Sequence, residues 1–519
     1  MTTARFTLLV LALVEGGAVM MAQLAAAKML APVYGSSLYV WGSVVGVTLA
    51  SLTTGYYLGG RLSRLSGRLP KVLWFMLLAA ALIALMPALA RPLLPLLVEL
   101  GTVPAILLLS SGLLGPALVL LGATSPLLIS LLTERVEEAG QASGTVYGVS
   151  TLGGIAGTFL AGFVLIPELG LTRTALIAAL VLGLPPLVLL LRHRRPAALG
   201  LPAAVAGALL LGPAPASHPD VEVIYHSEGL LGQLKVIDFT RRDADGRATG
   251  TERILFVNRT AQTWVMRDSG EPIWDYMRYI QSVASVLPEG SRVLLLGLGG
   301  GTIAQMLQDI GLQVDSVELD ARIARVASEH FGLAHSGDIF IDDGRRFLRV
   351  TDRRYDLIIF DVYQAEVPPA HLLTLETFRG LDALLEPGGF FIVNYSGYLQ
   401  GATGRGARSI YRTLLHAVEH VAVIPTASDE DSGNNLFIGS REPIDFSRPR
   451  QALLVGGRLL RLEDLLLPSD QIPLDDALIL RDNRPVLEKL NLEAAARWRR
   501  GYYDYFTRPL LDQGIPIFE

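Results

Sequence analysis

The chain contains no cysteine among its 519 residues, which excludes disulfides and thiolate metal sites but leaves the redox compartment open. Charged residues are also scarce, at 18% of the chain against 51% hydrophobic residues, a balance too apolar for one soluble domain of this length. The net charge is −5, so the chain does not have the excess of basic residues that is typical of a nucleic-acid-binding protein. Because the shortage of charge is confined to residues 6–215, we expect a membrane part followed by a water-soluble part.

Apolar stretches fill residues 1–215. A transmembrane helix needs about 20 apolar residues to cross the hydrocarbon layer. Candidate spans occur at 6–31, 37–60, 72–90, 102–132, 144–167, 172–191 and 197–213. The last is the shortest and the weakest. The sequence therefore predicts an α-helical transmembrane bundle of about seven spans, and the spacings Gly144-xxx-Gly148 and Gly153-xxx-Gly157 predict close helix packing within it.

Basic residues gather in the loops after the second and sixth predicted spans. These residues are Arg61, Arg64, Arg68 and Lys71 in one loop, and Arg192, Arg194 and Arg195 in the other. Short loops rich in lysine and arginine face the cytoplasm, so we expect both loops and the N-terminus on the cytoplasmic side of the inner membrane. A true span at 197–213 would carry the soluble part outside, whereas an interfacial or re-entrant segment would leave it in the cytoplasm. We adopt the cytoplasm, where small nucleoside cofactors are made.

An acidic residue, Glu15, lies inside the first predicted span. Acids within a membrane are energetically costly and often functional. Lys28 is too far along the same helix to pair with it, at about 20 Å. Glu15 is therefore either satisfied by another helix or a wet cavity, or it forms a ligand or cation site.

The soluble part begins with antiparallel strands. "QLKVIDF" and "RILFVN" resemble antiparallel strands joined by the polar loop "RRDADGRATG", which predicts a small β-hairpin domain at 216–272. From residue 273 near-continuous apolar strands alternate with helices. This pattern predicts a Rossmann-like, doubly wound α/β domain at 273–445, whose parallel sheet is covered on both faces. A C-terminal helical extension is expected at 446–519.

A glycine-rich turn follows the first strand of this sheet in "VLLLGLGGGTIAQML". Glycine lets the backbone approach a ligand without an intervening Cβ. Glu318 ends the next strand, where a carboxylate binds ribose hydroxyls. The glycine turn and Glu318 together favour a binding site for an adenosine-type cofactor. The alternative interpretation is a tight strand–helix turn with an unrelated glutamate on the surface. A strict G-x-G-x-x-G is missing, which favours a mononucleoside sulfonium such as S-adenosylmethionine or its decarboxylated form over a dinucleotide.

Two further acids end later strands. Asp343, in "IDDGRRF", is placed to accept from an adenine amino group, or else to cap the following helix. Asp361 follows four apolar residues in "YDLIIFDVY", so it faces the crevice at the sheet edge. There it can hold an ammonium group or accept its proton, or else cap a turn.

These segments, in this order, resemble the spermidine synthase (polyamine aminopropyltransferase) family. They resemble most closely its membrane-fused, multi-pass branch, the fused transporter/spermidine synthase-like proteins. The resemblance covers most of the chain. It rests on "SEGLLGQLKVID", "LFVNRTAQ", "RVLLLGLGGGTIAQML", "VDSVELD", "DDGRRFL", "YDLIIFDVYQAEVPPAHLLT" and "ILRDNRPVLEKL". It implies a class I methyltransferase-like fold.

The resemblance also implies a reaction and a set of site residues. In that family decarboxylated S-adenosylmethionine transfers its aminopropyl group to putrescine and leaves methylthioadenosine. By resemblance, the cofactor contacts are Gln233 and Gln262 at its methionine-derived end, the turn glycines Gly297, Gly299, Gly300 and Gly301, Glu318 at the ribose and Asp343 at the adenine. Asp361 would orient or deprotonate the attacking amine. The substrate contacts implied are Trp274, Asp275, Tyr363, Gln364 and Glu366.

The sequence departs from the family at two acidic positions. The soluble enzymes carry an acid in the glycine turn, where this chain has Gly300, and a second acid three residues after the catalytic one, where it has Gln364. Asp275 and Glu366 are the nearby candidates to replace them, so putrescine binding is less well supported than cofactor binding. An acid in the turn would repel the carboxylate of S-adenosylmethionine, whereas Gly300 would accept either cofactor.

Three functions follow. The first is a membrane-anchored aminopropyltransferase acting on putrescine or a related amine. The second is an S-adenosylmethionine-dependent methyltransferase acting on an amine, a lipid-linked or a protein substrate. The third is a transporter or sensor that binds a nucleoside or polyamine without turnover. We expect no metal and no nucleic acid, a polyamine and the lipid bilayer as partners, and a homodimer by analogy with the soluble relatives.

Overall fold

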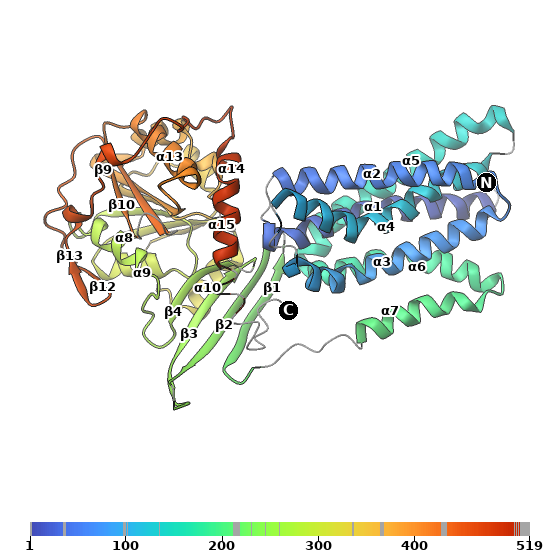
Figure 1. The fold of residues 1–519 in the computed structure, drawn as a ribbon, viewed down its shortest axis with the longest axis horizontal. Coiled ribbons are helices and arrows are strands. Elements are labelled where there is room, and N and C mark those ends of the chain that lie inside the picture. The colour runs from blue at the N-terminus through green and yellow to red at the C-terminus, as the bar shows by residue number, and fades with distance from the viewer. Residues whose placement is uncertain are drawn as a thin grey trace. The chain divides into compact units, whose positions relative to one another are not determined.

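The structure is a computed structural model. It describes residues 3–34, 38–96, 100, 102–133, 135–210, 218–229, 231–243, 245–258, 260–334, 337–363, 368–426, 433–502, 504, 506 and 508. The chain divides into two compact units, each described here by itself (Figure 1). The first consists mainly of residues 1–216, with residues 227–233, and the second mainly of residues 234–517.

The first unit is a bundle of long helices that run alongside one another (Figure 1). They are α1 (Thr3–Tyr34), α2 (Leu38–Leu62), α3 (Arg68–Leu96), α4 (Thr102–Leu132), α5 (Ala139–Leu160), α6 (Ile166–Arg192) and α7 (Gly200–Leu210). Short 3-10 turns at Val136–Glu138 and Pro196–Leu199 precede α5 and α7, and a π-helical turn at Ala161–Leu165 joins α5 to α6. Gly170 interrupts α6 with a left-handed φ of 81°, a conformation that glycine adopts without steric cost.

Four helical stretches among the described residues are long and apolar enough to cross a membrane. They are Thr3–Ala31, Arg68–Ala90, Val103–Leu132 and Val136–Arg192. The predicted count of about seven spans is therefore wrong. The predicted spans at 144–167 and 172–191 fall within one stretch of 57 residues. The span predicted at 37–60 forms α2, which is rich in Ser, Thr, Gly and Tyr, and the last forms α7, a helix of only 11 residues.

Glycines set the distance between α1 and α5. A Cβ added to Gly153 would lie 1.9 Å from the carbonyl oxygen of Leu13, and one added to Gly157 would lie 2.6 Å from that of Gly17. Such close approach of two helix backbones requires small residues at the contact. Gly144 and Gly148 have no heavy atom within 4 Å of an added Cβ. The pair Gly153 and Gly157 therefore lies at the contact between α1 and α5, and the pair Gly144 and Gly148 does not.

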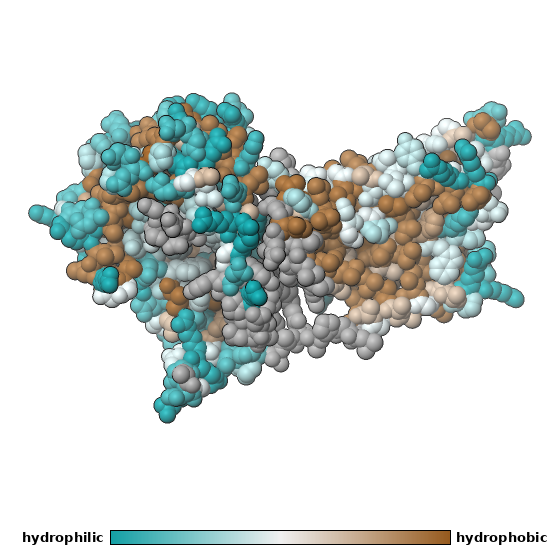
Figure 2. Space-filling view, in the orientation of Figure 1, coloured by the Kyte–Doolittle hydropathy of each residue, from teal (hydrophilic) through white to brown (hydrophobic). Residues whose placement is uncertain are grey.

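The surface of each unit reflects its composition. In Figure 2 the flank of the helical bundle is mostly hydrophobic, with hydrophilic residues gathered toward its end, whereas the α/β unit shows a largely hydrophilic surface. An apolar flank of this kind matches the hydrocarbon layer of a bilayer.

A small four-stranded sheet, in the order β1-β2-β3-β4, lies mostly in the second unit. Its strands are β1 (Val221–Gly229), β2 (Gly232–Arg242), β3 (Ala248–Val257) and β4 (Thr260–Met266). β3 pairs antiparallel with both β2 and β4. The predicted small antiparallel sheet is confirmed.

A seven-stranded sheet follows, in the order β10-β11-β9-β8-β5-β6-β7. Its strands are β5 (Arg292–Leu296), β6 (Gln313–Glu318), β7 (Ile339–Ile341), β8 (Tyr355–Phe360), β9 (Leu385–Gly397), β10 (His420–Pro425) and β11 (Gly433–Ser440). β5 to β9 pair in parallel, and β11 pairs antiparallel with β9 and β10. The predicted α/β fold is confirmed, with two further strands, β11 and β10, joined by antiparallel pairing at one edge.

Helices cover both faces of this sheet. They are α8 (Tyr276–Ala284), α9 (Thr302–Asp309), α10 (Ala321–His330), α11 (Gly344–Val350), α12 (Leu375–Gly380) and α13 (Arg405–Leu415). Leu295 and Ile359 are buried in one apolar core, whereas their neighbours Leu294 and Ile358 are buried in the other. Successive residues of a strand face opposite sides, so a sheet covered twice requires the unbroken apolar runs seen in the sequence.

The rest of the second unit is irregular. It contains the hairpin β12 (Leu453–Val455) and β13 (Arg458–Leu460), followed by α14 (Leu487–Leu490) and α15 (Leu492–Tyr502). Short 3-10 turns lie at Ala370–Leu372, Leu381–Ala383, Ala402–Gly404, Leu462–Leu465 and Ser469–Gln471.

The glycine contact between α1 and α5 generates a prediction about stability. Gly153→Ala places a methyl group against the backbone of α1, and we expect it to destabilise the bundle by about 1–3 kcal/mol, as for other overpacked cores. Gly144→Ala is the matched control, because open space surrounds it and alanine favours a helix by about 0.5–1 kcal/mol over glycine. Thermal loss of the helical circular dichroism signal in detergent measures both. Equal melting temperatures would contradict this contact.

Candidate functional site

The ends of β5 and β8 meet at the centre of the seven-stranded sheet. β6 lies on one side of β5 and β8 on the other, so the strand order reverses here. Open α/β sheets bind ligands at the carboxyl ends of the strands beside such a reversal. The Asp361 N–H donates to the carbonyl oxygen of Leu296 (2.9 Å), which places Asp361 next to Gly297. A Cβ on Gly297 would lie 2.2 Å from the Asp361 carbonyl oxygen, so only glycine fits.

The glycine turn is closed by neighbours that occupy the space of a side chain. The Gly300 N–H donates to Thr263 Oγ1 (2.7 Å). A Cβ on Gly300 would lie 2.7 Å from Thr263 Cγ2 and 3.0 Å from Phe331 Cδ1. An acidic residue at position 300 would therefore displace Thr263 or Phe331. Gly299 and Gly301 have left-handed φ values of 54° and 81°, which favour glycine.

Glu318 ties this turn to the end of β6. Its Oε2 accepts from the Leu298 N–H (3.1 Å) and its Oε1 from the Asp320 N–H (2.9 Å). Burial raises the pKa of the Glu318 carboxyl above its usual value, and these two hydrogen bonds partly oppose the shift. A carboxylate has about four acceptor positions, so Glu318 retains capacity for ribose hydroxyls.

Asp343 caps the helix that follows it. Its Oδ1 accepts from the Arg346 N–H (2.9 Å), and its Oδ2 lies 3.3 Å from His371 Nε2. The capping role that the sequence left open is thus present in the structure. Its carboxyl is also part-exposed, and contact with an adenine remains a prediction.

Asp361 is a part-buried carboxyl directly after β8. Its Oδ1 accepts from Asn394 Nδ2 (2.6 Å) and its Oδ2 from the Tyr276 hydroxyl (3.3 Å). Burial raises the pKa of the Asp361 carboxyl to about 6, although both hydrogen bonds act in the opposite direction. A group with a pKa near the working pH is suited to accept and release a proton.

Three of these partners were not identified from the sequence: Tyr276, Asn394 and Thr263. Tyr276 directly follows Asp275 in "IWDYMRY", and Asn394 interrupts the apolar run "FFIVNY". A polar residue at the end of a buried strand was the available signal for Asn394. Thr263 lies 37 residues before Gly300, and no local pattern links the two.

The predicted substrate residues near α8 have different surroundings. The Trp274 ring packs against Trp264 (6.1 Å between centroids, 85°) and Tyr276 (6.4 Å), so it lies beside the tyrosine that binds Asp361. Asp275 precedes α8 and is about half exposed, with Oδ1 3.5 Å from Arg278 Nε.

Tyr363 uses its hydroxyl within the sheet. It donates to the Asn394 carbonyl (2.7 Å) and accepts from the Ser396 N–H (2.6 Å). Burial raises the pKa of the Tyr363 hydroxyl well above its usual value. In this structure Tyr363 therefore supports β9 beside Asp361, and a contact with substrate stays a prediction.

The remaining predicted residues are placed less completely. Gln262 lies on β4, with its carbonyl oxygen 3.8 Å from a Cβ built on Gly299, so it borders the turn. Gln233 belongs to residues 227–233, which group with the first unit, and it is not described together with this site. Gln364 and Glu366 lie outside the described residues. Across the described ranges, no group of three or more His, Cys, Asp or Glu side chains could hold a metal ion.

Comparison with known proteins matches the same region. Residues 275–426 match the family described as "Spermine/spermidine synthase domain". The chain is 31% identical over 142 residues to an N-terminal histidine N-methyltransferase of Emericella nidulans, covering 26% of this chain and 24% of that protein. It is 27% identical over 177 residues to a probable polyamine aminopropyl transferase of Bifidobacterium longum, covering 34% and 38%.

A solved structure, a probable spermidine synthase from Corynebacterium glutamicum, has a TM-score of 0.40 and 23% identity, and the match covers 52% of this chain and 97% of that chain. The matches to the first curated relatives span less than half of the relatives' lengths. The resemblance to the spermidine synthase family is confirmed by the domain match. The resemblance to its membrane-fused branch stays a prediction.

The position of Glu318 generates a test of nucleoside binding. Glu318→Gln removes the charge and places an amide donor among backbone N–H groups, so we expect methylthioadenosine to bind about 10- to 100-fold more weakly, since hydrogen bonds to charged groups are worth about 1.5–3 kcal/mol. Isothermal titration calorimetry measures the affinity. Asp309→Asn, an exposed acid on α9, is the matched control and should bind as the wild type does. Unchanged affinity in Glu318→Gln would remove Glu318 from the ribose site.

Proposed function

We propose that this protein is a membrane-anchored polyamine aminopropyltransferase. It transfers the aminopropyl group of decarboxylated S-adenosylmethionine to putrescine or a related amine and releases methylthioadenosine. The observation that carries the proposal is the part-buried carboxyl of Asp361, to which Tyr276 and Asn394 donate hydrogen bonds beside the glycine turn. The domain match at residues 275–426 and the aminopropyl transferase among the relatives support it.

Different residues of the site bind the cofactor and position the amine. Decarboxylated S-adenosylmethionine supplies a carbon made electrophilic by the adjacent sulfonium. Glu318 and the amides of the glycine turn hold its nucleoside, and the turn lets it approach because no Cβ stands in the way. Asp361 orients the amine for in-line attack, a positioning effect of large magnitude. As the C–N bond forms and the C–S bond breaks, the amine nitrogen gains positive charge and its proton passes to Asp361.

The same proposal assigns the parts of the chain. Residues 1–215 anchor the protein in the inner membrane, and residues 216–272 place a small β-domain before the catalytic domain at 273–445. Residues 446–519 follow as an extension of that domain. The catalytic domain faces the cytoplasm, where both small substrates are made. A homodimer is proposed by analogy with the soluble relatives.

A methyltransferase is the second candidate, and Gly300 is the observation that favours it. Thr263 and Phe331 leave no room there for an acid, and without that acid the carboxylate of S-adenosylmethionine meets no repulsion. A relative in the comparison is itself an N-terminal histidine N-methyltransferase. The two reactions leave different nucleosides, methylthioadenosine and S-adenosylhomocysteine.

The product identifies the reaction. We expect purified protein, given each cofactor with putrescine, to form methylthioadenosine from the decarboxylated one. Asp361→Asn should lower kcat by about 10²- to 10⁴-fold, the usual contribution of a positioned acid–base group. Asp309→Asn, the same change at an exposed site, should leave kcat unchanged. S-adenosylhomocysteine as the sole product, or full turnover by Asp361→Asn, would overturn the proposal.

The pKa of Asp361 sets the pH dependence. The proposal requires the ionised carboxylate, so kcat/KM should rise as the pH increases through about 6. The Tyr276 hydroxyl hydrogen-bonds to the ionised form and lowers the pKa of Asp361. Tyr276→Phe should therefore move this ascending limb to higher pH, whereas Tyr279→Phe on the same helix should not. If the rise of kcat/KM in Tyr276→Phe occurs at the same pH as in the wild type, or at lower pH, Asp361 is not the group whose ionisation controls activity.

A further inference from the structure

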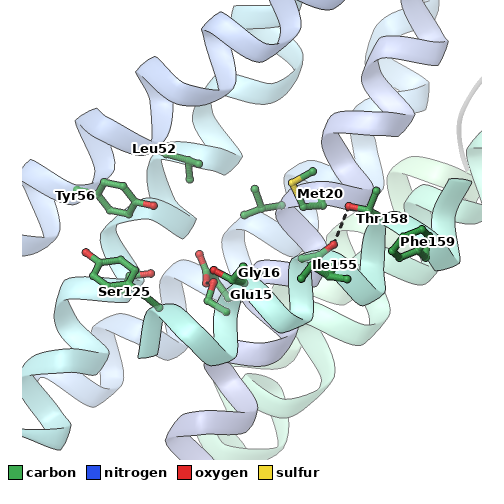
Figure 3. Close-up of a pocket in the computed structure, with 14 residues that line it drawn as sticks. Glu15, Gly16, Met20, Leu52, Tyr56, Ser125, Ile155, Thr158 and Phe159 are labelled. Atoms are coloured by element: carbon green, nitrogen blue, oxygen red, sulfur yellow. Dashed lines mark hydrogen bonds between the residues drawn. The ribbon is translucent and has the colours of Figure 1, made fainter. Parts of the chain in front are cut away.

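A cavity of about 380 Å³ lies within the helical unit. It is lined by α1, α2, α4 and α5, and its polar lining residues include Glu15, Tyr56, Ser125, Tyr147 and Ser150. Figure 3 shows the Glu15 carboxylate and the Tyr56 hydroxyl directed into the same space. The volume falls in the range of small-molecule sites, about 300–1,000 Å³. Nothing in the proposed transferase reaction uses this cavity.

Glu15 is the buried acid of the cavity. It lies near the midpoint of the stretch Thr3–Ala31 and is 3% exposed. Ser150 Oγ donates to its Oε2 (2.8 Å). The glycine contact holds this pair together, since a Cβ on Gly16 would lie 1.9 Å from the Ser150 carbonyl oxygen. Within the part of the chain that the structure describes, no Lys, Arg or His forms an ion pair with Glu15.

Two tyrosine rings form another part of the cavity wall. Tyr56 and Tyr147 meet edge to face, with centroids 6.4 Å apart and planes at 86°. Aromatic rings attract organic cations through their electron-rich faces. Ile155 and Phe159, also in the lining, are 50% and 59% exposed on this unit. The cavity therefore opens on an apolar flank, with its charge at the inner end.

We propose that this cavity binds the protonated form of an organic amine. The ammonium group pairs with Glu15 beside the Ser150 hydroxyl, and the apolar part of the ligand extends between the tyrosines toward Ile155 and Phe159. A single carboxylate with hydroxyls and rings suits an ammonium group better than a hard cation, which takes about six or more oxygen ligands. Among the described residues Glu15 has the Ser150 hydrogen bond but no cationic partner, and an ionised acid within a membrane is energetically costly.

The lack of cysteine makes the site directly testable. Thr151→Cys places a unique thiol on an exposed lining residue of the full-length protein in detergent. We expect cationic aminoethyl methanethiosulfonate to react faster, relative to neutral methyl methanethiosulfonate, with Glu15 present than in Glu15→Gln. The expected difference in this rate ratio is about tenfold, equal to about 1.4 kcal/mol of electrostatic attraction. Gly144→Cys, on α5 but outside the cavity lining, should give a ratio that does not depend on Glu15.

Ligand protection identifies the class of cation. Hexylamine should slow the reaction of the neutral reagent at Thr151→Cys, sodium chloride at the same concentration should not, and Glu15→Gln should abolish the protection. Tyr56→Leu, a change at an exposed position, should weaken protection and serves if Glu15→Gln fails to fold. Equal rate ratios with and without Glu15 would show an acid that stays neutral and would overturn the proposal, as would equal protection by sodium. Because the assay measures thiol labelling and not turnover, its outcome does not depend on whether the proposed transferase function is correct.

Discussion

The hydrogen bond from the Asp361 N–H to the Leu296 carbonyl joins the ends of β5 and β8, and the candidate site is arranged around it. It brings Gly297, directly after β5, beside Asp361, directly after β8. Gly297 makes this approach possible, because any side chain there would strike the Asp361 backbone. The rest of the turn is held by two hydrogen bonds, in which the Leu298 N–H donates to Glu318 and the Gly300 N–H donates to Thr263. The geometry depends on main-chain contacts, which side-chain changes elsewhere disturb little.

In both units, glycine residues allow two backbone segments to approach closely and thereby position a carboxyl group. In the α/β unit, missing Cβ atoms let strand ends approach. In the helical unit, Gly16 and Gly153 let α1 and α5 touch, which brings Glu15 to Ser150. Each contact places a carboxyl away from solvent with a hydroxyl donor beside it, Tyr276 for Asp361 and Ser150 for Glu15. Buried carboxyls with so few donors interact strongly with any cation that reaches them, because the local dielectric is low.

Much of the fold followed from the period of apolar residues. Apolar runs separated by helices indicated the parallel sheet. Asp361 was found because it follows such a run, and Glu318 because it ends the strand after the glycine turn. The span count failed because apolar composition does not report helix continuity or length. One stretch of 57 residues covered two predicted spans, and α7 proved too short. Nor could the sequence distinguish Gly153 from Gly144, which differ only in what lies opposite them.

The sequence by itself determined the alternation of strands and helices in the α/β unit, the acids at its strand ends and the family that this domain resembles. These properties depend on residues close together along the chain. The tertiary structure decided which groups meet. Tyr276 reaches Asp361 across 85 positions, and Asn394 reaches it across 33. Burial and these two hydrogen bonds together set the pKa of Asp361, and Thr263 and Phe331 fill the space beside Gly300. Protonation and steric room arise from neighbours distant in sequence, and only the folded chain brings them together.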